Sequence, residues 1–197
     1  MPPLPSPAEP SPTTAAPTTA APTTAAPTAV AAPVVRAAVA DDLPTVAAIL
    51  EPYVTGTAVT FDEQTPDVAT WRQRLVDLDA RGLPFLVAEV DGAVVGYAYA
   101  APWRPKAAYR YTVEDTIYLA PAAQGRGVGS LLMTALLEAC TRAGVRQVVA
   151  VVADDPAAAG SLPLHRRFGF EVAGVLRDVG VKHGRSVSTT LLQRTLA

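Results

Sequence analysis

Residues 124–129 read Gln-Gly-Arg-Gly-Val-Gly and lie between an apolar run, Thr116–Pro121, and a segment with helical periodicity, Ser130–Ala143. Three glycines at a strand-to-helix junction allow the backbone to turn its N–H groups toward one point in front of the helix. Free amide donors and the positive end of the helix dipole favour an anion at that point. The glycines alone leave two interpretations open, a phosphate-binding loop or an ordinary tight turn.

The spacing of these glycines differs from that of two common nucleotide-binding motifs. No Gly-Lys-Ser/Thr follows, as a Walker loop requires, and the glycines lack the spacing of the dinucleotide fingerprint. Positions 124, 127 and 129 instead give Gln-x-x-Gly-x-Gly. The segment therefore resembles the pyrophosphate loop of the GNAT acetyltransferase superfamily, which binds acetyl-CoA.

Composition and charge limit the remaining possibilities. The length of 197 residues suits one domain, and 16 basic against 18 acidic side chains give a formal net charge of −2. No basic stripe stands out, which argues against a nucleic-acid surface. The single cysteine, Cys140, falls within a helical pattern and is interpreted as a small buried side chain. Because it cannot form an internal disulfide, a reducing compartment is compatible with the chain.

Residues 1–33 differ from the rest in composition. Proline recurs at five-residue spacing from Pro12 to Pro27, and Glu9 is the only charged side chain before Arg36. Such a segment lacks the amide donors and the apolar surface that folding needs, so we predict a disordered tail before a domain at residues 34–197. The tail has no secretory-signal pattern, and no run of about 18 apolar residues predicts a membrane span. A secreted stalk would share this composition, but a cytoplasmic enzyme fits the remainder better.

Hydrophobic periodicity and turn signals from residue 34 onward predict a series of alternating elements. The expected strands are Val34–Ala38, Phe85–Val90, Ala93–Ala101, Thr112–Leu119, Gln147–Val152 and two that meet at Lys182-His183-Gly184; the expected helices run from Asp41 or Asp42 to Tyr53, from Thr65-Pro66-Asp67 to Gly82, from Ser130 to Ala143 and from Ser161 to Phe168. This order predicts an α/β (α+β) fold with a mixed, mostly antiparallel sheet and helices on both faces. It is also the order of the GNAT fold.

One branch of that superfamily is similar in more detail. Residues 86–92, 96–103 and 108–118, together with Leu164-His165 and Lys182-His183-Gly184, resemble phosphinothricin acetyltransferases. The similarity covers about residues 34–195. The motif aromatic-Thr-x-Glu-x-Thr/Ser-x-Tyr-x-x-Pro at residues 111–121, followed by the glycine loop, is specific to this branch.

The chemistry of acetyl transfer assigns a role to Glu114. An amine attacks a thioester only when neutral, whereas the pKa of an α-amino group is about 8 in water. A carboxylate near the acceptor can take the proton directly or through a water molecule. Glu114 starts the strand expected to border the cofactor and matches the catalytic glutamate of the family, so we interpret it as the general base. The alternative is a solvated carboxylate at a strand end.

The resemblance implies further site residues. His165 matches the second catalytic residue of the family, where a histidine can donate a proton to the departing thiolate or relay one from the amine; the alternative is a histidine on the exposed side of a short helix. His183 is interpreted as structural or adjacent to the substrate. The pantetheine arm would lie between the strands Thr112–Leu119 and Gln147–Val152, with a backbone N–H of residues 117–119 as oxyanion donor. The residues implied for the cofactor are Ile117, Tyr118, Leu119, Gln124, Gly125, Arg126, Gly127, Val128, Gly129 and Ser130.

Several positions depart from the family pattern. Ala158 replaces an asparagine common in the superfamily, and Pro163 interrupts the helix that follows. Residues 185–188 read Arg-Ser-Val-Ser, so the family's tryptophan and acid after Lys-His-Gly are missing. These changes leave the identity of the acceptor open. Tyr109, Arg110 and Tyr111 are candidate substrate-binding residues, although core packing of the two tyrosines and a plain surface position of Arg110 are equally open.

The sequence therefore predicts an N-acetyltransferase that moves acetyl from acetyl-CoA to the free amine of a small amino-acid-like acceptor. The resemblance implies phosphinothricin, methionine sulfone or methionine sulfoximine, detoxified by loss of the charged amine, and a homodimer. No metal is expected, since two histidines and one cysteine do not supply a zinc cluster. The alternatives are acetylation of another amine, such as a peptide N-terminus or a polyamine, and a non-catalytic acyl-CoA-binding module.

Overall fold

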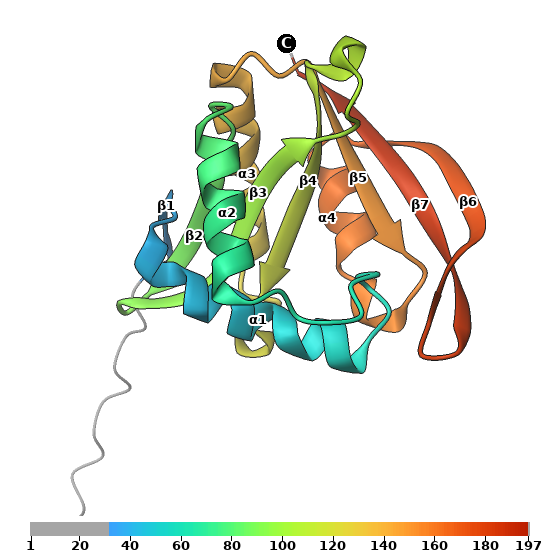
Figure 1. The fold of residues 1–197 in the computed structure, drawn as a ribbon, viewed down its shortest axis with the longest axis horizontal. Coiled ribbons are helices and arrows are strands. Elements are labelled where there is room, and N and C mark those ends of the chain that lie inside the picture. The colour runs from blue at the N-terminus through green and yellow to red at the C-terminus, as the bar shows by residue number, and fades with distance from the viewer. Residues whose placement is uncertain (1–31, 197) are drawn as a thin grey trace, which may run out of the picture.

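The computed structural model of the protein describes residues 32–196, which form a seven-stranded sheet (Figure 1). The strands are β1 (Val34–Ala37), β2 (Phe85–Val90), β3 (Ala93–Pro102), β4 (Thr112–Leu119), β5 (Gln147–Ala153), β6 (Glu171–Lys182) and β7 (Arg185–Thr195). Their order is β1-β2-β3-β4-β5-β7-β6, and only β4 and β5 pair in parallel. The predicted mixed, mostly antiparallel sheet is confirmed.

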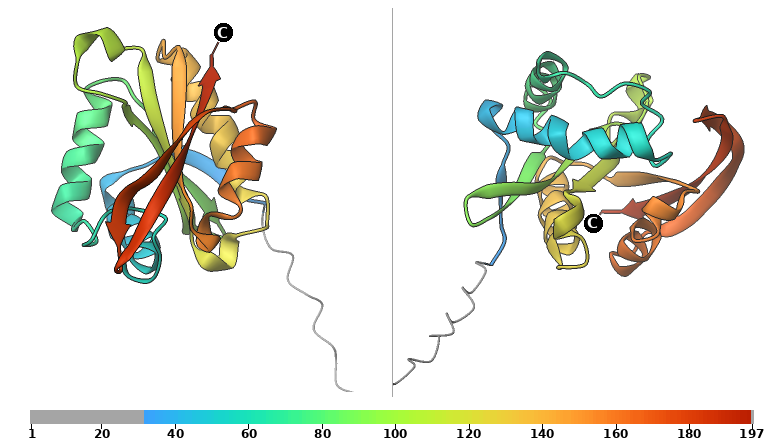
Figure 2. Two further views of the ribbon diagram at one scale, coloured as in Figure 1. Left: turned by 90° about the vertical axis from the view of Figure 1, so that its right-hand side faces the viewer. Right: turned by 90° about the horizontal axis from the view of Figure 1, so that it is seen from below.

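Helices cover both faces of the sheet, as predicted. α1 (Leu43–Gly56) and α2 (Val68–Asp79) lie on one face, and α3 (Val128–Arg142) and α4 (Ser161–Arg167) lie on the other (Figure 2). Short 3-10 turns occur at Ala40–Asp42, Ala107–Tyr109, Pro121–Ala123 and Pro156–Ala158. The predicted tail at residues 1–33 lies outside the described residues except for Ala32 and Pro33, so the domain boundary stays a prediction.

Local chemistry explains the element boundaries. α2 begins at Val68 because the Asp67 side chain accepts a hydrogen bond from the Thr70 N–H at 2.7 Å and caps the helix. Asp91 and Gly92 both have positive φ, 50° and 78°, as a two-residue hairpin between β2 and β3 requires. The expected interruption at Pro163 is wrong. Pro163 is the third residue of α4, in the first turn where an N–H has no partner within the helix.

Two apolar cores follow from the alternation of side chains along the strands. On the α1 and α2 face, Trp71 packs with Phe85, Val87 and Tyr97. On the α3 and α4 face, a second core contains the alternate residues of the same strands, such as Ala88 and Ala98, with Leu132, Met133, Leu136 and Cys140 from α3. Cys140 is fully buried, as expected, and burial raises the pKa of its thiol to about 12.

Gly96 marks the closest approach between β3 and the end of β4. A Cβ at this position would lie 2.5 Å from Leu119 Cδ2, 3.0 Å from the Tyr118 carbonyl oxygen and 3.4 Å from Leu132 Cδ1. The Leu119 side chain can rotate, but the Tyr118 backbone is held in the sheet. Only glycine fits here without moving β4.

We expect Gly96→Ala to destabilise the fold by about 1–3 kcal/mol, because the added methyl overpacks the β3–β4 contact. Thermal and urea unfolding of the purified variant measure the loss. Gly174→Ala in β6 is the matched control, since a Cβ there meets no atom within 4 Å. Equal stability of the two variants would contradict the proposed clash.

Candidate active site

The site is built on a split in the sheet. β4 and β5 pair over only three positions, Thr112–Glu114 against Gln147–Val149, and then diverge. β4 remains paired with β3 as far as Leu119, and β5 remains paired with β7 as far as Ala153 (Figure 1). A cavity of about 810 Å³ opens between the two strands, and residues of the glycine loop, α4 and the segment after α1 complete its lining.

Backbone groups of β4 face this cleft. The Ala120 N–H donates to the Val95 carbonyl at 2.8 Å, and alternate residues of an antiparallel strand direct their backbone groups to the same neighbour. The backbone N–H and C=O groups of Tyr118 therefore point toward β3, whereas those of Ile117 and Leu119 point into the cleft. The Tyr53 hydroxyl donates to the Leu119 carbonyl at 2.6 Å, which leaves the N–H groups of Ile117 and Leu119 for a ligand.

Two glycines turn the chain between β4 and α3. Gly125 and Gly127 have positive φ, 71° and 83°, and Gly127 is the N-cap residue of α3. Gln124, Gly125, Gly127, Gly129 and Ser130 line the cavity. The Val128 side chain is buried in the core, so this residue offers only its backbone, and Arg126 is exposed outside the lining.

Side chains hold the loop in place. The Gln124 Nε2 group donates to the Tyr53 hydroxyl at 2.7 Å. On the other side of the loop, Arg167 of α4 lines the cavity and donates to Ser130 Oγ at 3.3 Å. Arg167 thus brings a cation to the helix N-terminus, which favours an anion there.

Glu114 lies where the two strands begin to separate. Residues two apart share a face of a strand, so Glu114 faces the same side as Tyr118, toward α1 and α2. Its carboxylate is half-buried and lines the cavity, rather than standing in solvent. Burial, with the adjacent Asp115 charge, raises the pKa of Glu114, and Arg104 partly opposes this.

An aromatic and cationic group shares this side of the cavity. Phe61, Arg74, Tyr99 and Thr116 all line it. Arg74 Nη1 donates to the Tyr99 hydroxyl at 3.0 Å, and its guanidinium lies over the rings of Trp71 and Tyr99 at 4.8 and 5.2 Å. The cavity near Glu114 therefore contains a fixed positive charge between aromatic walls.

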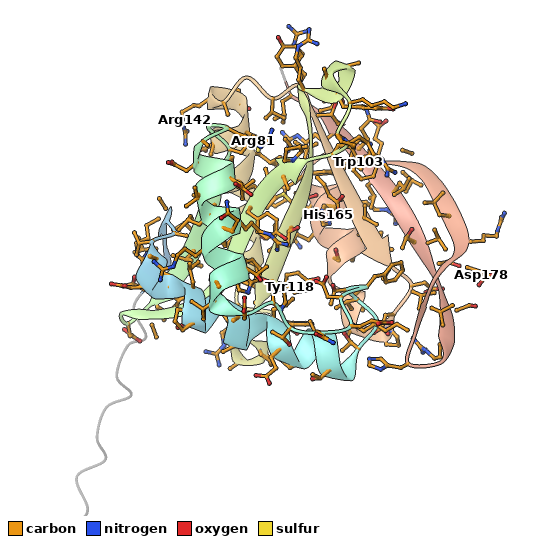
Figure 3. All side chains as sticks on the ribbon, viewed as in Figure 1. Arg81, Trp103, Tyr118, Arg142, His165 and Asp178 are labelled. Atoms are coloured by element: carbon orange, nitrogen blue, oxygen red, sulfur yellow. The ribbon has the colours of Figure 1, made fainter. Side chains whose placement is uncertain are left out.

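His165 is buried and belongs to the opposite face. It is 5% exposed, so the alternative of a histidine on an exposed helix side is wrong. Its Nε2 lies 2.9 Å from Asp115 Oδ2, and its Nδ1 lies 2.8 Å from the Ser161 carbonyl oxygen. Figure 3 shows His165 in the space between β4 and β5. Burial lowers the pKa of His165, but the Asp115 carboxylate and the Ser161 carbonyl outweigh burial and raise it.

The three candidate substrate residues are not brought to the cavity. Tyr109 and Tyr111 are 44% and 40% exposed, and neither they nor Arg110 line it. Tyr111 lies under the guanidinium groups of Arg110 and Arg146 at 4.7 and 4.6 Å. Arg110 thus has the surface position that the sequence left open, and a role of these residues in substrate binding stays a prediction.

The last hairpin supports the segment that closes the cavity at residues 57–66. Lys182, which is buried, donates from Nζ to the Thr60 carbonyl at 2.7 Å, and burial lowers the pKa of this amine. The Phe61 ring lies so close to Gly180 that a Cβ there would fall 2.4 Å from it. Asp155 accepts from the Ala58 N–H and from Arg185, so Arg185, one of the departures from the family pattern, has a structural partner.

Residues 32–196 show neither a metal-binding cluster nor a membrane-spanning helix. No group of three or more His, Cys, Asp or Glu side chains is arranged to hold a metal ion. No helix in this part of the chain has the length and apolarity needed to cross a membrane.

The site combines three features: a split between two strands, a glycine loop at the N-terminus of α3, and a half-buried carboxylate. This combination is typical of an acyltransferase site. The family model described as "Acetyltransferase (GNAT) family" matches residues 45–170. The chain is 48% identical over 157 residues to a phosphinothricin N-acetyltransferase of Alcaligenes faecalis, covering 79% of each protein. It is 39% identical over 163 residues to an L-methionine sulfoximine/L-methionine sulfone acetyltransferase of Pseudomonas aeruginosa, covering 82% of this chain and 93% of that protein.

A solved structure is similar in fold as well. A GNAT superfamily phosphinothricin acetyltransferase from Sinorhizobium meliloti, in complex with acetyl-CoA, superposes with a TM-score of 0.79 at 40% identity, covering 84% of this chain and 89% of that one. The chain belongs to the GNAT acetyltransferase family, and the family resemblance seen in its sequence is confirmed.

We expect Lys182→Met to raise the acceptor KM about tenfold, because a charge-assisted hydrogen bond that holds the segment at residues 57–66 is lost. Steady-state kinetics with varied acceptor measure this, and the Kd of acetyl-CoA, measured by calorimetry, should not change. Arg177→Met, an exposed substitution on the same strand, is the control. A change in acetyl-CoA binding with an unchanged acceptor KM would contradict this role of the hairpin.

Proposed function

We propose that the protein transfers acetyl from acetyl-CoA to the free amine of a small amino-acid-like acceptor of the phosphinothricin, methionine sulfone or methionine sulfoximine type. The observation that carries the proposal is the split between β4 and β5, with Glu114 at its closed end and the glycine loop at its open end. The named activities of the relatives at 48% and 39% identity support this acceptor class.

The residues around the split fit acetyl-CoA. Free N–H groups at the start of α3, together with Arg126 and Arg167, suit a pyrophosphate. The N–H groups of Ile117 and Leu119 face the cleft and suit an extended amide chain lying along β4. When bound, acetyl-CoA supplies an activated acyl carbonyl. The acetyl-CoA complex of the Sinorhizobium meliloti relative supports the same assignment.

Glu114 would act as the general base. Its carboxylate has no hydrogen-bond partner among the described residues, so both oxygens can accept a proton. The amine nitrogen forms a bond to the acyl carbon as its proton passes to Glu114, and an N–H of residue 117 or 119 stabilises the oxyanion. Collapse of the intermediate breaks the carbon–sulfur bond. A thiol pKa of about 8.5 allows the sulfur to leave as a thiolate and take its proton from water.

The cation in the cavity favours an acidic acceptor. Arg74 is fixed over two aromatic rings and faces the same space as Glu114. A guanidinium in this position suits the carboxylate or phosphinate of an amino-acid-like acceptor and opposes a polycation. A polyamine acceptor is therefore disfavoured, and a cytoplasmic location stays a prediction from sequence.

Activity with a panel of acceptors tests the proposal. We expect acetyl-CoA-dependent thiol release with phosphinothricin and methionine sulfone, and little release with polyamines or a short peptide. Glu114→Gln should lower kcat by about 10²–10⁴-fold while acetyl-CoA binding is kept, because only the base is removed. Glu138→Gln, an exposed change on α3, is the matched control.

The pH profile tests the same role of Glu114. Because burial raises its pKa above the ordinary value of 4.5, the base is lost as the pH falls through that raised value. The acidic limb of kcat/KM should therefore lie above pH 4.5. Acetyl-CoA binding without thiol release for any acceptor would instead support a non-catalytic binding module.

We also propose a homodimer through the outer edge of the sheet. β6 is an edge strand, and five of its aliphatic side chains are 43–70% exposed: Val172, Val175, Leu176, Val179 and Val181. An open edge with contiguous apolar side chains favours association. We expect a mass of about twice 20.4 kDa by sedimentation, reduced by joint Val179→Lys and Val181→Lys substitution. Joint substitution of the exposed Val34 and Val39 is the control, and a wild-type monomer would contradict the dimer.

A further inference from the structure

The hydrogen-bond partners of His165 bear on its charge state. Its Nδ1 lies 2.8 Å from the Ser161 carbonyl oxygen, which can only accept, and 3.3 Å from the Ser161 hydroxyl. The shorter contact, with the carbonyl, places a proton on Nδ1. Its Nε2 lies 2.9 Å from Asp115 Oδ2, and an ionised carboxylate also only accepts. With Asp115 ionised, both ring nitrogens are donors, which makes the ring an imidazolium paired with a carboxylate.

The surroundings of Asp115 favour the same charge state. The residue is 7% exposed, and its second oxygen, Oδ1, is buried without a hydrogen-bond partner among the described residues. A buried carboxylate with an unused oxygen is costly unless a cation compensates it. The neighbouring titratable group from α3 is the Cys140 thiol, whose pKa is raised, so it stays neutral. The Phe170 ring meets His165 edge-on at 5.0 Å.

The pair spans the split in the sheet. Asp115 follows Glu114 on β4, one position beyond the last pairing with β5, and His165 lies on α4, which follows β5 in the chain. Ser161 and Leu164 of the same helix line the cavity. α4 has seven residues, too few to form a stable helix alone, so its position depends on tertiary contacts such as this one.

We propose that Asp115 and His165 are positioning residues: a charged pair that holds α4 against β4 and sets the width of the cleft that receives acetyl-CoA, with no part in proton transfer. Neither ring nitrogen is free to protonate a departing thiolate, because each already donates to a protein oxygen. The inference rests on the proposed acetyl transfer only for its kinetic consequences, because the charge state is measured without turnover.

Nitrogen-15 NMR of the imidazole rings tests the charge state. The chain has two histidines, and His165→Gln identifies the signals of His165. At pH 6.5 both nitrogens of His165 should show the shifts of protonated imidazolium, and the titration midpoint should lie above the ordinary value of 6.5. In Asp115→Asn the ring should be neutral, with one protonated nitrogen. An unprotonated nitrogen in the wild-type ring at pH 6.5 would overturn the charged pair, whatever the enzyme acetylates.

Steady-state kinetics test the positioning role. For Asp115→Ala and His165→Gln we expect the acetyl-CoA KM to rise about tenfold or more, with kcat lowered less than tenfold, since a buried bridge is lost and no reacting group is. Asp115→Asn can still hydrogen-bond the ring but removes the ion pair, so its KM should lie between those of the wild type and Asp115→Ala. A loss of about 10²-fold or more in kcat of His165→Gln at unchanged KM would show a proton donor and overturn the proposal.

The Tm of each variant accompanies the kinetics. If His165→Gln and Asp115→Ala fail to fold, Asp115→Asn and the NMR of the wild type still decide the question. Loss of activity in Glu114→Gln with normal His165 signals would concern the proposed function and leave the positioning pair intact.

Discussion

The short parallel pairing of β4 with β5 is the constraint on which the rest of the site depends. Every other neighbouring pair in the sheet is antiparallel, whereas β4 and β5 hold together at three positions and then separate. Separation leaves N–H groups of Ile117 and Leu119 without a strand partner, and a backbone donor inside a protein needs an acceptor. A ligand with amide groups along its length meets that need. The cleft therefore results from the order and divergence of the strands, and not from a depression in the surface of the sheet.

Successive side chains of β4 point to opposite faces of the sheet, so its polar residues lie on two different sides. Glu114 and Asp115 are neighbours in sequence, but their side chains leave the strand on opposite sides. Glu114 lines the cavity on the α1 and α2 face, as do Arg74 and Tyr99. Asp115 meets His165 beside α4 and the cofactor side. The two carboxylates therefore have different surroundings: Asp115 is paired with His165, whereas Glu114 lines the cavity.

The fold was largely predictable from the sequence, and the site only in part. Strands such as Phe85–Val90 and Thr112–Leu119 have clear apolar patterns and turn signals, and the structure gives the same bounds. Glu114 and five residues of the glycine loop line the cavity, and their roles stay predictions. The sequence analysis did not identify four residues that line the cavity: Phe61, Arg74, Asp115 and Arg167. Each reaches the cavity through tertiary packing, which local sequence spacing does not reveal. Of these, only Asp115 could have been noticed in the sequence, because it is an acidic residue at a strand position whose neighbours two residues away, Val113 and Ile117, are apolar. Tyr109, Arg110 and Tyr111 do not line the cavity despite their proximity to Glu114 in the sequence, and their role in substrate binding stays a prediction.

The residues proposed for catalysis and the segment at residues 57–66 are held by different parts of this fold. Glu114, the cleft and the glycine loop lie on the central strands and on α3, which the two cores hold rigidly. The segment at residues 57–66 instead depends on three contacts with the periphery: Lys182 to Thr60, Gly180 to Phe61, and Asp155 to Ala58. Substitutions in the last hairpin, such as Arg185 facing Asp155, therefore act on the wall of the acceptor space while the transfer machinery stays in place. A substitution in this hairpin can therefore alter this wall of the cavity without altering the split between β4 and β5.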